Sequence, residues 1–200
     1  MPLIVFEGPD GCGKTTQSEL LVQRLRARGR PARRLREPGG TPLGEAVRAW
    51  LLDPAHDPCP TAELFGYLMA RAELCQRVLI PALAAGEWLV LDRFWHSTLA
   101  YQAWGLGLDP ARVRAAIELA IGGLRADLAV LLAVSEEELQ RRRAGAARDR
   151  IEARDAEFQR RVRAGYERLA ADGELTVIDG RGDPDAVAAR LWPLVAALGA

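Results

Sequence analysis

The sequence predicts an α/β fold with three layers, in which a central parallel sheet of about five strands is covered by helices on both faces. Short apolar runs alternate with longer helical stretches along the 200 residues, as in strands joined by crossover helices. The runs are apolar at consecutive positions, which is typical of strands buried on both faces. The chain contains no internal repeat and no long linker, so we expect residues 1–200 to form one domain.

The strands are predicted from five runs of apolar residues. Trp88–Leu91 is the clearest of them, and Ala32–Arg36 is the weakest because three of its residues are arginines. In chain order the expected strands are Leu3–Phe6, Ala32–Arg36, Trp88–Leu91, Leu128–Val134 and Leu175–Ile178.

The helices are predicted from the stretches between these strands. Gly29 is suited to end the first helix, and Ser135 with Glu138 forms a capping-box pattern at the start of a later one. The expected helices are Thr15–Arg28, Leu43–Leu52, Ala62–Ala85, Thr98–Trp104, Pro110–Ile121, Ser135–Arg142, Ala153–Ala171 and Asp185–Leu198. The Arg/Ala/Gly-rich stretch Arg141–Arg150 is predicted to be either a frayed helix end or a mobile basic loop.

Composition restricts the classes of partner. The 27 basic and 27 acidic residues give zero formal net charge, which offers no support for nucleic-acid binding. Cys12, Cys59 and Cys75 have neither the paired spacing of a metal site nor a disulfide framework, as expected in a reducing cytosol. The N-terminal residues lack a basic signal region, and no apolar run approaches the length of a membrane span. We therefore expect a cytoplasmic protein without membrane or nucleic-acid partners.

A phosphate-binding loop follows the first expected strand and precedes a helix. It matches the Walker A spacing with the residues Gly8, Pro9, Asp10, Gly11, Cys12, Gly13, Lys14 and Thr15. Its glycines allow backbone N–H groups to surround phosphate oxygens at the positive end of a helix dipole. Lys14, the only lysine of the chain, would reach the β- and γ-phosphates, and Thr15 would offer its hydroxyl to Mg²⁺. The motif predicts a P-loop NTPase fold and an ATP site that also includes Thr16.

A second phosphate site is predicted where the second and third strands end. Ligands of open parallel sheets bind at the carboxyl ends of the strands, so Asp92 and Arg93 should face the same crevice as the loop. Asp92 is suited to hold Mg²⁺, partly through water, and Arg93 to bind phosphate. A surface salt bridge explains this pair equally well. Arg36 and Glu37 precede a Pro-Gly-Gly turn that either aims them into the crevice or is an ordinary turn.

Four sequence blocks together resemble the bacterial thymidylate kinase family. They are Phe6–Gln17, Arg36–Thr41, Asp92–Gln102 and Asp149–Glu152, and they occur in family order across nearly the whole chain. The third is the most specific, because a generic P-loop enzyme has no reason to carry it. The resemblance implies phosphorylation of dTMP to dTDP with Mg-ATP, a mobile lid at about residues 141–152, and a homodimer.

The resemblance also implies roles for residues around dTMP. Arg36 and Arg93 would hold the acceptor phosphate, and Arg71 would hydrogen-bond the thymine edge. Tyr67 lies one helical turn before Arg71 and would stack on the base, although periodicity alone favours a core aromatic beside an exposed arginine. Tyr101 would crowd the 2′ position of the sugar and so favour deoxyribose. The other residues expected to line this pocket are Glu37, Ser97, Thr98 and Gln102.

Catalysis is expected to depend on positioning and charge neutralisation, because the acceptor is already a phosphate anion and needs no general base. The residues expected at the reacting phosphates are Lys14, Arg93 and Asp10. The phosphate loop has no arginine where some thymidylate kinases carry one, so the resemblance places the catalytic arginine in the lid. The candidates are Arg143, Arg148 and Arg150, and the alternative is a solvated basic helix face.

Other functions compatible with the phosphate loop stay open. The nearest is another deoxynucleotide or nucleoside kinase on the same fold. A nucleotide switch, an ATPase subunit and a non-catalytic binding module are further alternatives. The block Asp92–Gln102 and the pair Tyr67 and Arg71 argue against a switch or an ATPase subunit, because such proteins bind no phosphate acceptor. The intact phosphate loop together with Asp92 argues against a non-catalytic module.

Overall fold

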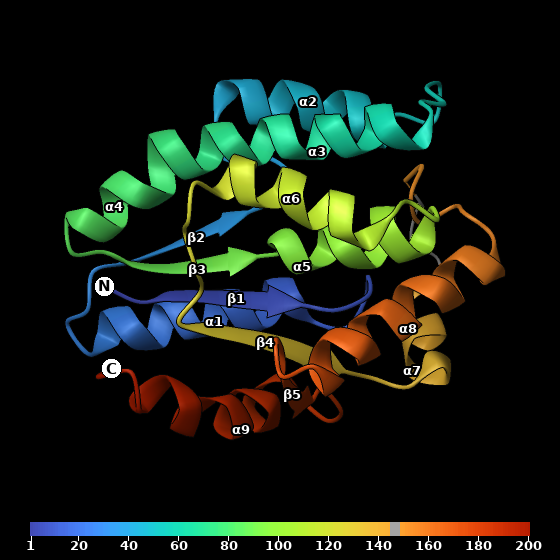
Figure 1. Ribbon diagram of the computed structural model, residues 1–200. Helices are drawn as coiled ribbons and strands as arrows, with labels where there is room; N and C mark the ends of the chain where they lie inside the picture. The colour runs from blue at the N-terminus through green and yellow to red at the C-terminus, as the bar shows by residue number, and fades with distance from the viewer. Residues whose placement is uncertain (145–148) are drawn as a thin grey trace.

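The computed structural model describes residues 1–144 and 149–200. Its five-stranded parallel sheet has the order β2-β3-β1-β4-β5. The strands are β1 (Leu3–Glu7), β2 (Ala32–Arg36), β3 (Trp88–Asp92), β4 (Leu128–Ala133) and β5 (Thr176–Asp179). Helices cover both faces of this sheet, so the predicted three-layer α/β architecture is confirmed (Figure 1).

The helices occur between the strands, as the sequence predicts. They are α1 (Lys14–Ala27), α2 (Pro42–Leu52), α3 (Pro60–Leu74), α4 (Ile80–Ala84), α5 (Trp95–Thr98), α6 (Pro110–Ile121), α7 (Glu136–Arg143), α8 (Ala156–Ala171) and α9 (Pro184–Ala196). Two π-helical segments, η1 (Cys75–Leu79) and η2 (Leu99–Gly105), continue α3 and α5. Within the described residues, every helix is too short or too polar to cross a bilayer.

The apolar strands supply two hydrophobic cores, one on each face of the sheet. In β1, Leu3 and Val5 pack with residues of α3, α6 and α8, whereas Ile4 and Phe6 pack with residues of α1 and α9. All four side chains are fully buried. Successive strand residues point to opposite faces, so a strand covered on both sides must be apolar at every position. α2 lies outside α3, farther from the sheet (Figure 1).

Several helix boundaries differ from the prediction. The helix expected from residue 153 begins at Ala156, because Asp155 acts as its N-cap and accepts the N–H of Phe158 at 2.7 Å. The segment expected to be one helix over residues 62–85 changes to a π-helical turn ahead of Pro81, which has no N–H to donate. The helix expected from Thr98 begins at Trp95.

The capping box predicted at the start of α7 is only half formed. Ser135 Oγ accepts the backbone N–H of Glu138 at 3.4 Å, as expected for an N-cap. The carboxylate of Glu138 instead accepts Arg142 Nε at 2.7 Å, one turn further along the helix. A charged partner at i+4 therefore replaces the reciprocal bond to the N-cap backbone.

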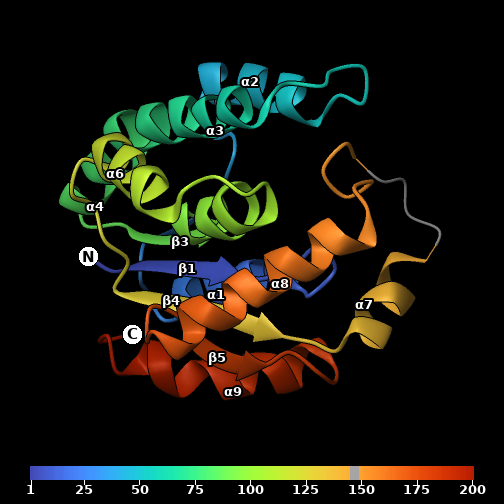
Figure 2. The ribbon, with the colours of Figure 1, turned by 45° about the vertical axis from the view of Figure 1, so that its right-hand side comes forward.

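The strand register brings the predicted motifs to one edge of the sheet. Asp92 at the end of β3 is paired with Arg36 of β2 on one side and with Phe6 of β1 on the other. The phosphate loop leaves β1 at this same edge, at the centre of the sheet. Figure 2 shows α7 and the beginning of α8 beyond the carboxyl ends of β1 and β4. This edge is the place where the sheet topology predicts a ligand site.

Candidate active site

The loop between β1 and α1 forms a tight anion-binding turn. Gly8, Gly11 and Gly13 have φ values of 133°, 80° and 104°, a region that side chains other than glycine rarely enter. A Cβ at Gly8 would lie 2.9 Å from Cys12 Sγ, so the turn leaves no space for a larger residue. The N-terminus of α1 follows directly and presents the positive end of its dipole to the loop.

The ammonium group of Lys14 lies inside this loop. Its Nζ donates to the carbonyl oxygens of Gly8 and Pro9, both at 3.0 Å, and lies 3.7 Å from Asp10 Oδ1. The side chain is buried, so its charge is poorly screened by water. A phosphate entering the loop would therefore meet a cation that is already in position.

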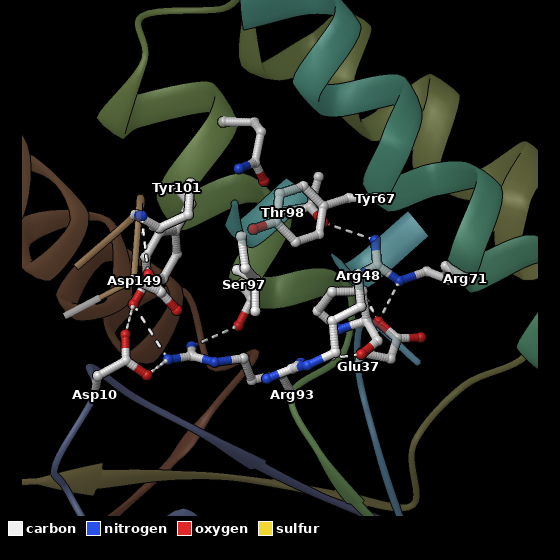
Figure 3. Close-up of a pocket in the computed structure, with 14 residues that line it drawn as sticks. Asp10, Glu37, Arg48, Tyr67, Arg71, Arg93, Ser97, Thr98, Tyr101 and Asp149 are labelled. Atoms are coloured by element: carbon white, nitrogen blue, oxygen red, sulfur yellow. Dashed lines mark hydrogen bonds and ion pairs between the residues drawn. The ribbon is translucent and has the colours of Figure 1, made fainter. Parts of the chain in front are cut away.

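Asp10 and Arg93 form an ion pair between the loop and the end of β3 (Figure 3). Arg93 Nη2 donates to Asp10 Oδ1 at 2.5 Å, while Nη1 donates to Ser97 Oγ at 3.1 Å and to Tyr166 Oη at 2.9 Å. Burial by itself would raise the pKa of the Asp10 carboxyl, but the charges of Arg93 and Lys14 hold this pKa well below its usual range. The carboxylate of Asp10 is thus ionised and forms the anionic partner of Arg93 beside the phosphate loop.

A buried carboxylate fixes the turn that carries Arg93. Glu7 accepts the N–H groups of Phe94 at 2.8 Å and Ser97 at 3.3 Å, and the Ser97 hydroxyl at 2.6 Å. Burial alone would raise the pKa of Glu7, but the nearby His96, Ser97 and Arg93 lower it. Arg93 itself has a left-handed φ of 71°, which is uncommon for a residue with a side chain. The contacts to Glu7 stabilise this backbone and so orient the guanidinium.

Thr15 and Asp92 meet beside the phosphate loop. Thr15 Oγ1 donates to Asp92 Oδ2 at 2.8 Å, and Arg34 Nη2 lies 3.5 Å from the same oxygen. The part of the chain that the structure describes holds no cluster of three or more His, Cys, Asp or Glu side chains arranged for a metal ion. A hydroxyl and a carboxylate oxygen nevertheless suit Mg²⁺, which usually takes its other ligands from phosphates and water. These two residues therefore fit a magnesium ion that arrives with a nucleotide.

A second cavity adjoins Arg93 and lies between α3 and η2 (Figure 3). Tyr67 of α3 and Tyr101 of η2 border it from different elements. Tyr101 Oη accepts from Arg93 Nη2 at 3.2 Å and donates to Asp10 Oδ2 at 3.3 Å. Asp149, just after the undescribed residues, borders the same cavity. The space is thus aromatic on its sides and charged at the end next to the phosphate loop.

Arg71 is a fixed, buried donor in the wall of this cavity. Its guanidinium donates to Glu37 Oε2 at 2.8 Å, to Thr98 Oγ1 at 2.7 Å and to the carbonyl oxygen of Phe94 at 3.1 Å. The side chain is 2% exposed, so it cannot leave these partners without losing a buried ion pair and two hydrogen bonds. Burial raises the pKa of Glu37, and the charge of Arg71 opposes this rise.

Two consecutive arginines at the end of α7 contact the phosphate loop. Arg143 Nε donates to the carbonyl oxygen of Asp10 at 2.7 Å. Arg142 Nη1 donates to the carbonyl oxygen of Cys12 at 3.3 Å, and its Nη2 donates to that of Gly180 at 3.1 Å. The loop is therefore flanked by cations from α7, which adds positive potential where the phosphates of a nucleotide would lie.

The chain is similar to known proteins over nearly its whole length. The family model for thymidylate kinase matches residues 6–191 of the chain. The thymidylate kinase of Synechococcus sp. (strain JA-2-3B'a(2-13)) is 47% identical over 195 residues, which cover 96% of this chain and 93% of that protein. The chain belongs to the thymidylate kinase family. The resemblance predicted from the motifs is thereby confirmed.

Further members of the thymidylate kinase family agree with this assignment. The thymidylate kinase of Caldanaerobacter subterraneus subsp. tengcongensis is 42% identical over 179 residues, which cover 88% of this chain and 86% of that protein. The crystal structure of thymidylate kinase from Ehrlichia chaffeensis matches with a TM-score of 0.81 and 29% identity, over 98% of each chain. The fold, and not only the sequence motifs, is thus that of the thymidylate kinases.

The structure gathers most of the predicted site residues around two adjoining cavities. Lys14 and Arg93 border the same cavity, and Arg93 borders the neighbouring one as well. The predicted residues that border the cavity at the phosphate loop are Asp10, Gly11, Gly13, Lys14, Thr15, Thr16, Arg36, Glu37, Asp92 and Arg93. Those that border the second cavity are Asp10, Glu37, Tyr67, Arg71, Arg93, Ser97, Thr98, Tyr101 and Gln102.

Two of these residues have protein partners at the groups that were expected to bind substrate. Arg36 was expected to hold the acceptor phosphate, but it pairs with Glu45 at 2.9 Å at the solvent-exposed rim. Glu37 was expected to contact substrate, and its carboxylate is taken up by Arg71. In both cases an oppositely charged neighbour on a helix pairs with the group, but among the described residues the buried Oε1 of Glu37 has no hydrogen-bond partner.

The lid arginines predicted for a thymidylate kinase do not share one location. Arg143 contacts the loop, as described above, and Arg148 lies outside the described residues. Arg150 does not reach the loop, because it donates to Glu63 Oε2 at 2.7 Å and to the carbonyl oxygen of Leu51 at 2.7 Å. A buried carboxylate is a stronger partner than the solvent at the edge of the loop, so Arg150 is drawn toward α3.

Several charged residues of the site were missed by sequence reasoning. Arg48 of α2 borders both cavities and donates to the carbonyl oxygen of Pro38 at 3.0 Å. Arg34 of β2 borders the loop cavity and donates to Ser18 Oγ at 2.8 Å. Arg142 lies in the arginine-rich stretch of the predicted lid, and this basic stretch could have indicated that Arg142 belongs to the site. Arg48 gave no such signal, because only the packing of α2 on α3 brings it to the cavities.

Proposed function

We propose that residues 1–200 act as one catalytic unit that transfers the γ-phosphoryl group of ATP to dTMP, which yields ADP and dTDP. The observation that carries this proposal is the common cavity of Lys14 and Arg93. Lys14 belongs to the donor loop and Arg93 to the end of the neighbouring strand. Two anions held by these cations would approach each other directly, which is the main requirement of phosphoryl transfer.

The donor side is supported by the surroundings of the phosphate loop. A hollow bordered by Gly11, Gly13 and Arg142 continues to Gly180 and Gly182, between β5 and α9. The triphosphate of ATP would lie in the loop and its nucleoside part in this hollow. Backbone N–H groups, the dipole of α1 and Lys14 would then neutralise the phosphate charge.

The acceptor side is supported by the second cavity. The phosphate of dTMP would bind to Arg93, and thymine would lie beside Tyr67 with its polar edge toward Arg71. Arg71 is held rigidly by Glu37 and Thr98, which lowers the entropy cost of recognising the base. Tyr101 would stand next to the sugar, where its ring disfavours a 2′ hydroxyl.

We also propose that Mg²⁺ is the metal ion, held through Thr15 and Asp92. Their oxygens lie within hydrogen-bond distance of each other at the phosphate loop. Thr15 and Asp92 would hold the ion together with ATP, and the ion would supply positive charge that neutralises the phosphates during transfer.

A coupled assay of dTDP and ADP formation from dTMP and Mg-ATP tests the proposed function. dTMP should be a better acceptor than dUMP, dCMP, AMP or thymidine, and ADP release should depend on dTMP. An equal rate of ADP release without dTMP would show an ATPase instead. A preference for another acceptor in the panel would assign a different nucleotide or nucleoside kinase.

Arg71→Ala is expected to raise the KM for dTMP by about tenfold to a hundredfold, with the KM for ATP nearly unchanged. The change removes a charged donor to the base and leaves Glu37 buried without its partner. Initial rates with each substrate varied in turn measure the two constants. Arg125→Ala is the matched control, because this exposed arginine pairs with Glu118 on the surface and borders neither cavity. An equal rise of the KM values for dTMP and ATP would show that Arg71 does not bind the base and that the base pocket lies elsewhere.

We further propose that the protein forms a homodimer through the outer face of α2 and α3. Leu43, Phe65 and Met69 are 43%, 59% and 49% exposed, and Leu43 and Met69 border one shallow depression. Apolar side chains grouped in this way are typical of interfaces.

Phe65→Glu is therefore expected to shift the mass measured by light scattering from that of a dimer to that of a monomer. Val177→Glu on β5, at the far edge of the sheet, should leave the dimer intact. A monomeric wild-type protein would contradict the proposal.

A further inference from the structure

A buried ion cluster joins α3 to the segment that precedes α8. Glu63 is 0% exposed, and its Oε2 accepts Arg150 Nη2 at 2.7 Å and Arg154 Nη2 at 2.6 Å. Its Oε1 accepts Gln102 Nε2 at 3.0 Å. One carboxylate thus holds two guanidinium groups and an amide that come from different parts of the chain.

The same cluster reaches the end of α2. Arg150 Nε donates to the carbonyl oxygen of Leu51 at 2.7 Å, and the backbone N–H of Arg150 donates to that of Leu52 at 3.3 Å. α2, α3, η2 and residues 150–154 therefore meet around the carboxylate of Glu63. The side chain of Glu63 is the shared acceptor at this junction.

The junction lies directly behind the acceptor cavity. Gln102 and Leu52 border that cavity, and so do Asp149 and Ile151 on either side of Arg150. The guanidinium of Arg154 also lies 4.7 Å from the ring of Phe158, which packs edge-on against Tyr101. The position of residues 149–154 therefore decides part of the cavity wall.

We propose that Glu63 is a positioning residue that holds residues 149–154 against α3 as a wall of the acceptor cavity. The inference rests on the proposed function, because it concerns binding of dTMP. It predicts a larger effect on binding of the acceptor than on binding of the donor. Of residues 149–154 only Glu152 borders the phosphate-loop cavity, and the arginine contacts with the loop come from Arg142 and Arg143 of α7. Those residues approach from the other side of the undescribed segment.

Loss of the carboxylate charge would leave two partly buried arginines without the counterion that they share. An uncompensated buried charge is strongly destabilising, so residues 150–154 should move toward solvent. In Glu63→Gln the KM for dTMP is expected to rise on the order of tenfold, because a small displacement of a cavity wall misplaces the substrate. The KM for ATP should stay within about twofold of the wild-type value, because the loop contacts remain.

Limited trypsin digestion of the full-length protein provides a readout that does not depend on activity. The side chains of Arg150 and Arg154 are only 9% and 19% exposed, whereas that of Arg160 is 70% exposed. In Glu63→Gln, mass spectrometry should show faster cleavage after Arg150 and Arg154 and unchanged cleavage after Arg160. dTMP should slow the cleavage after Arg150 in the wild-type protein more than in the variant.

Two further variants make the test selective. Glu63→Asp keeps the charge and should recover part of the affinity for dTMP, and it also serves if the glutamine variant does not fold. Glu174→Gln breaks the Arg114–Glu174 ion pair just before β5, at the amino-terminal edge of the sheet, and should leave both KM values unchanged.

Two results would overturn the proposal. One is a Glu63→Gln variant with unchanged dTMP affinity and unchanged cleavage. The other is an equal rise of both KM values together with faster cleavage at every site, which would make Glu63 a general stability residue. If the wild-type protein does not phosphorylate dTMP, the proposed function is wrong. The cleavage pattern would still show whether Glu63 holds residues 149–154 in place.

Discussion

Arg93→Ala is expected to lower kcat/KM for dTMP by about a thousandfold. Arg93 borders both cavities and lies at the end of β3 beside the phosphate loop, so its guanidinium faces the place where donor and acceptor phosphates would meet. The cavity side of this group is already oriented by Ser97, Tyr166 and the turn that Glu7 fixes. Truncation removes a pre-positioned guanidinium that would bind two oxygens of the acceptor phosphate. Mobile water molecules cannot stabilise the phosphate charge as well as this fixed group does.

The same truncation releases Asp10, which has a second cation close by. Lys14 Nζ lies 3.7 Å from Asp10 Oδ1, so the freed carboxylate would draw Lys14 away from the donor phosphates. The KM for ATP should therefore also rise, by less than the KM for dTMP. Arg93→Lys keeps the charge without the fork and should give an intermediate rate. Steady-state kinetics of the two variants measure these constants. If kcat/KM for dTMP falls less than tenfold in Arg93→Ala, Arg93 does not bind the acceptor phosphate.

Arg143→Ala is expected to lower kcat by on the order of a thousandfold, with a smaller effect on either KM. Arg143 is the predicted lid arginine that contacts the loop in the described part of the chain. A guanidinium there is placed to stabilise charge on the transferring group, and that charge develops only in the transition state. Single-turnover measurements separate this step from product release.

The matched control is Arg141→Ala, two residues earlier on α7. Arg141 is largely exposed and pairs with Glu138 on the surface, so its loss should leave kcat nearly unchanged. Arg150→Ala should weaken the affinity for dTMP more than it lowers kcat, because Arg150 belongs to the Glu63 cluster. A normal kcat in Arg143→Ala would show that another lid arginine stabilises the transferring phosphoryl group. A normal rate after replacement of Arg143, Arg148 and Arg150 together would exclude these three arginines.

Much of the site follows from local spacing in the sequence. The phosphate loop needs its glycines and Lys14 at fixed intervals within eight residues, so the motif carries its own geometry. The strand ends were also predictable, because parallel strands bring their carboxyl ends to one edge. The structure agrees with this rule, since Asp92 is paired with Arg36 at that edge.

The partners of the charged residues could not be predicted in the same way. Arg150 and Glu63 are 87 residues apart, and no local pattern shows that one carboxylate will bind Arg150 and Arg154 together. Arg36 illustrates the converse, because its turn was predicted but its side chain pairs with Glu45 of α2. The choice of partner depends on which helices pack together and how deeply each charge is buried.

The sequence by itself determined the parallel sheet, the phosphate loop and the family, since these depend on the order and spacing of residues along the chain. Only the tertiary structure decided which arginines face the phosphates and which are held elsewhere. It separated Arg143 at the loop from Arg150 at Glu63, although the two share one basic stretch. The physical reason is that a fully buried carboxylate such as Glu63 must be paired with a cation, and the packing of the helices decides which arginines can reach it.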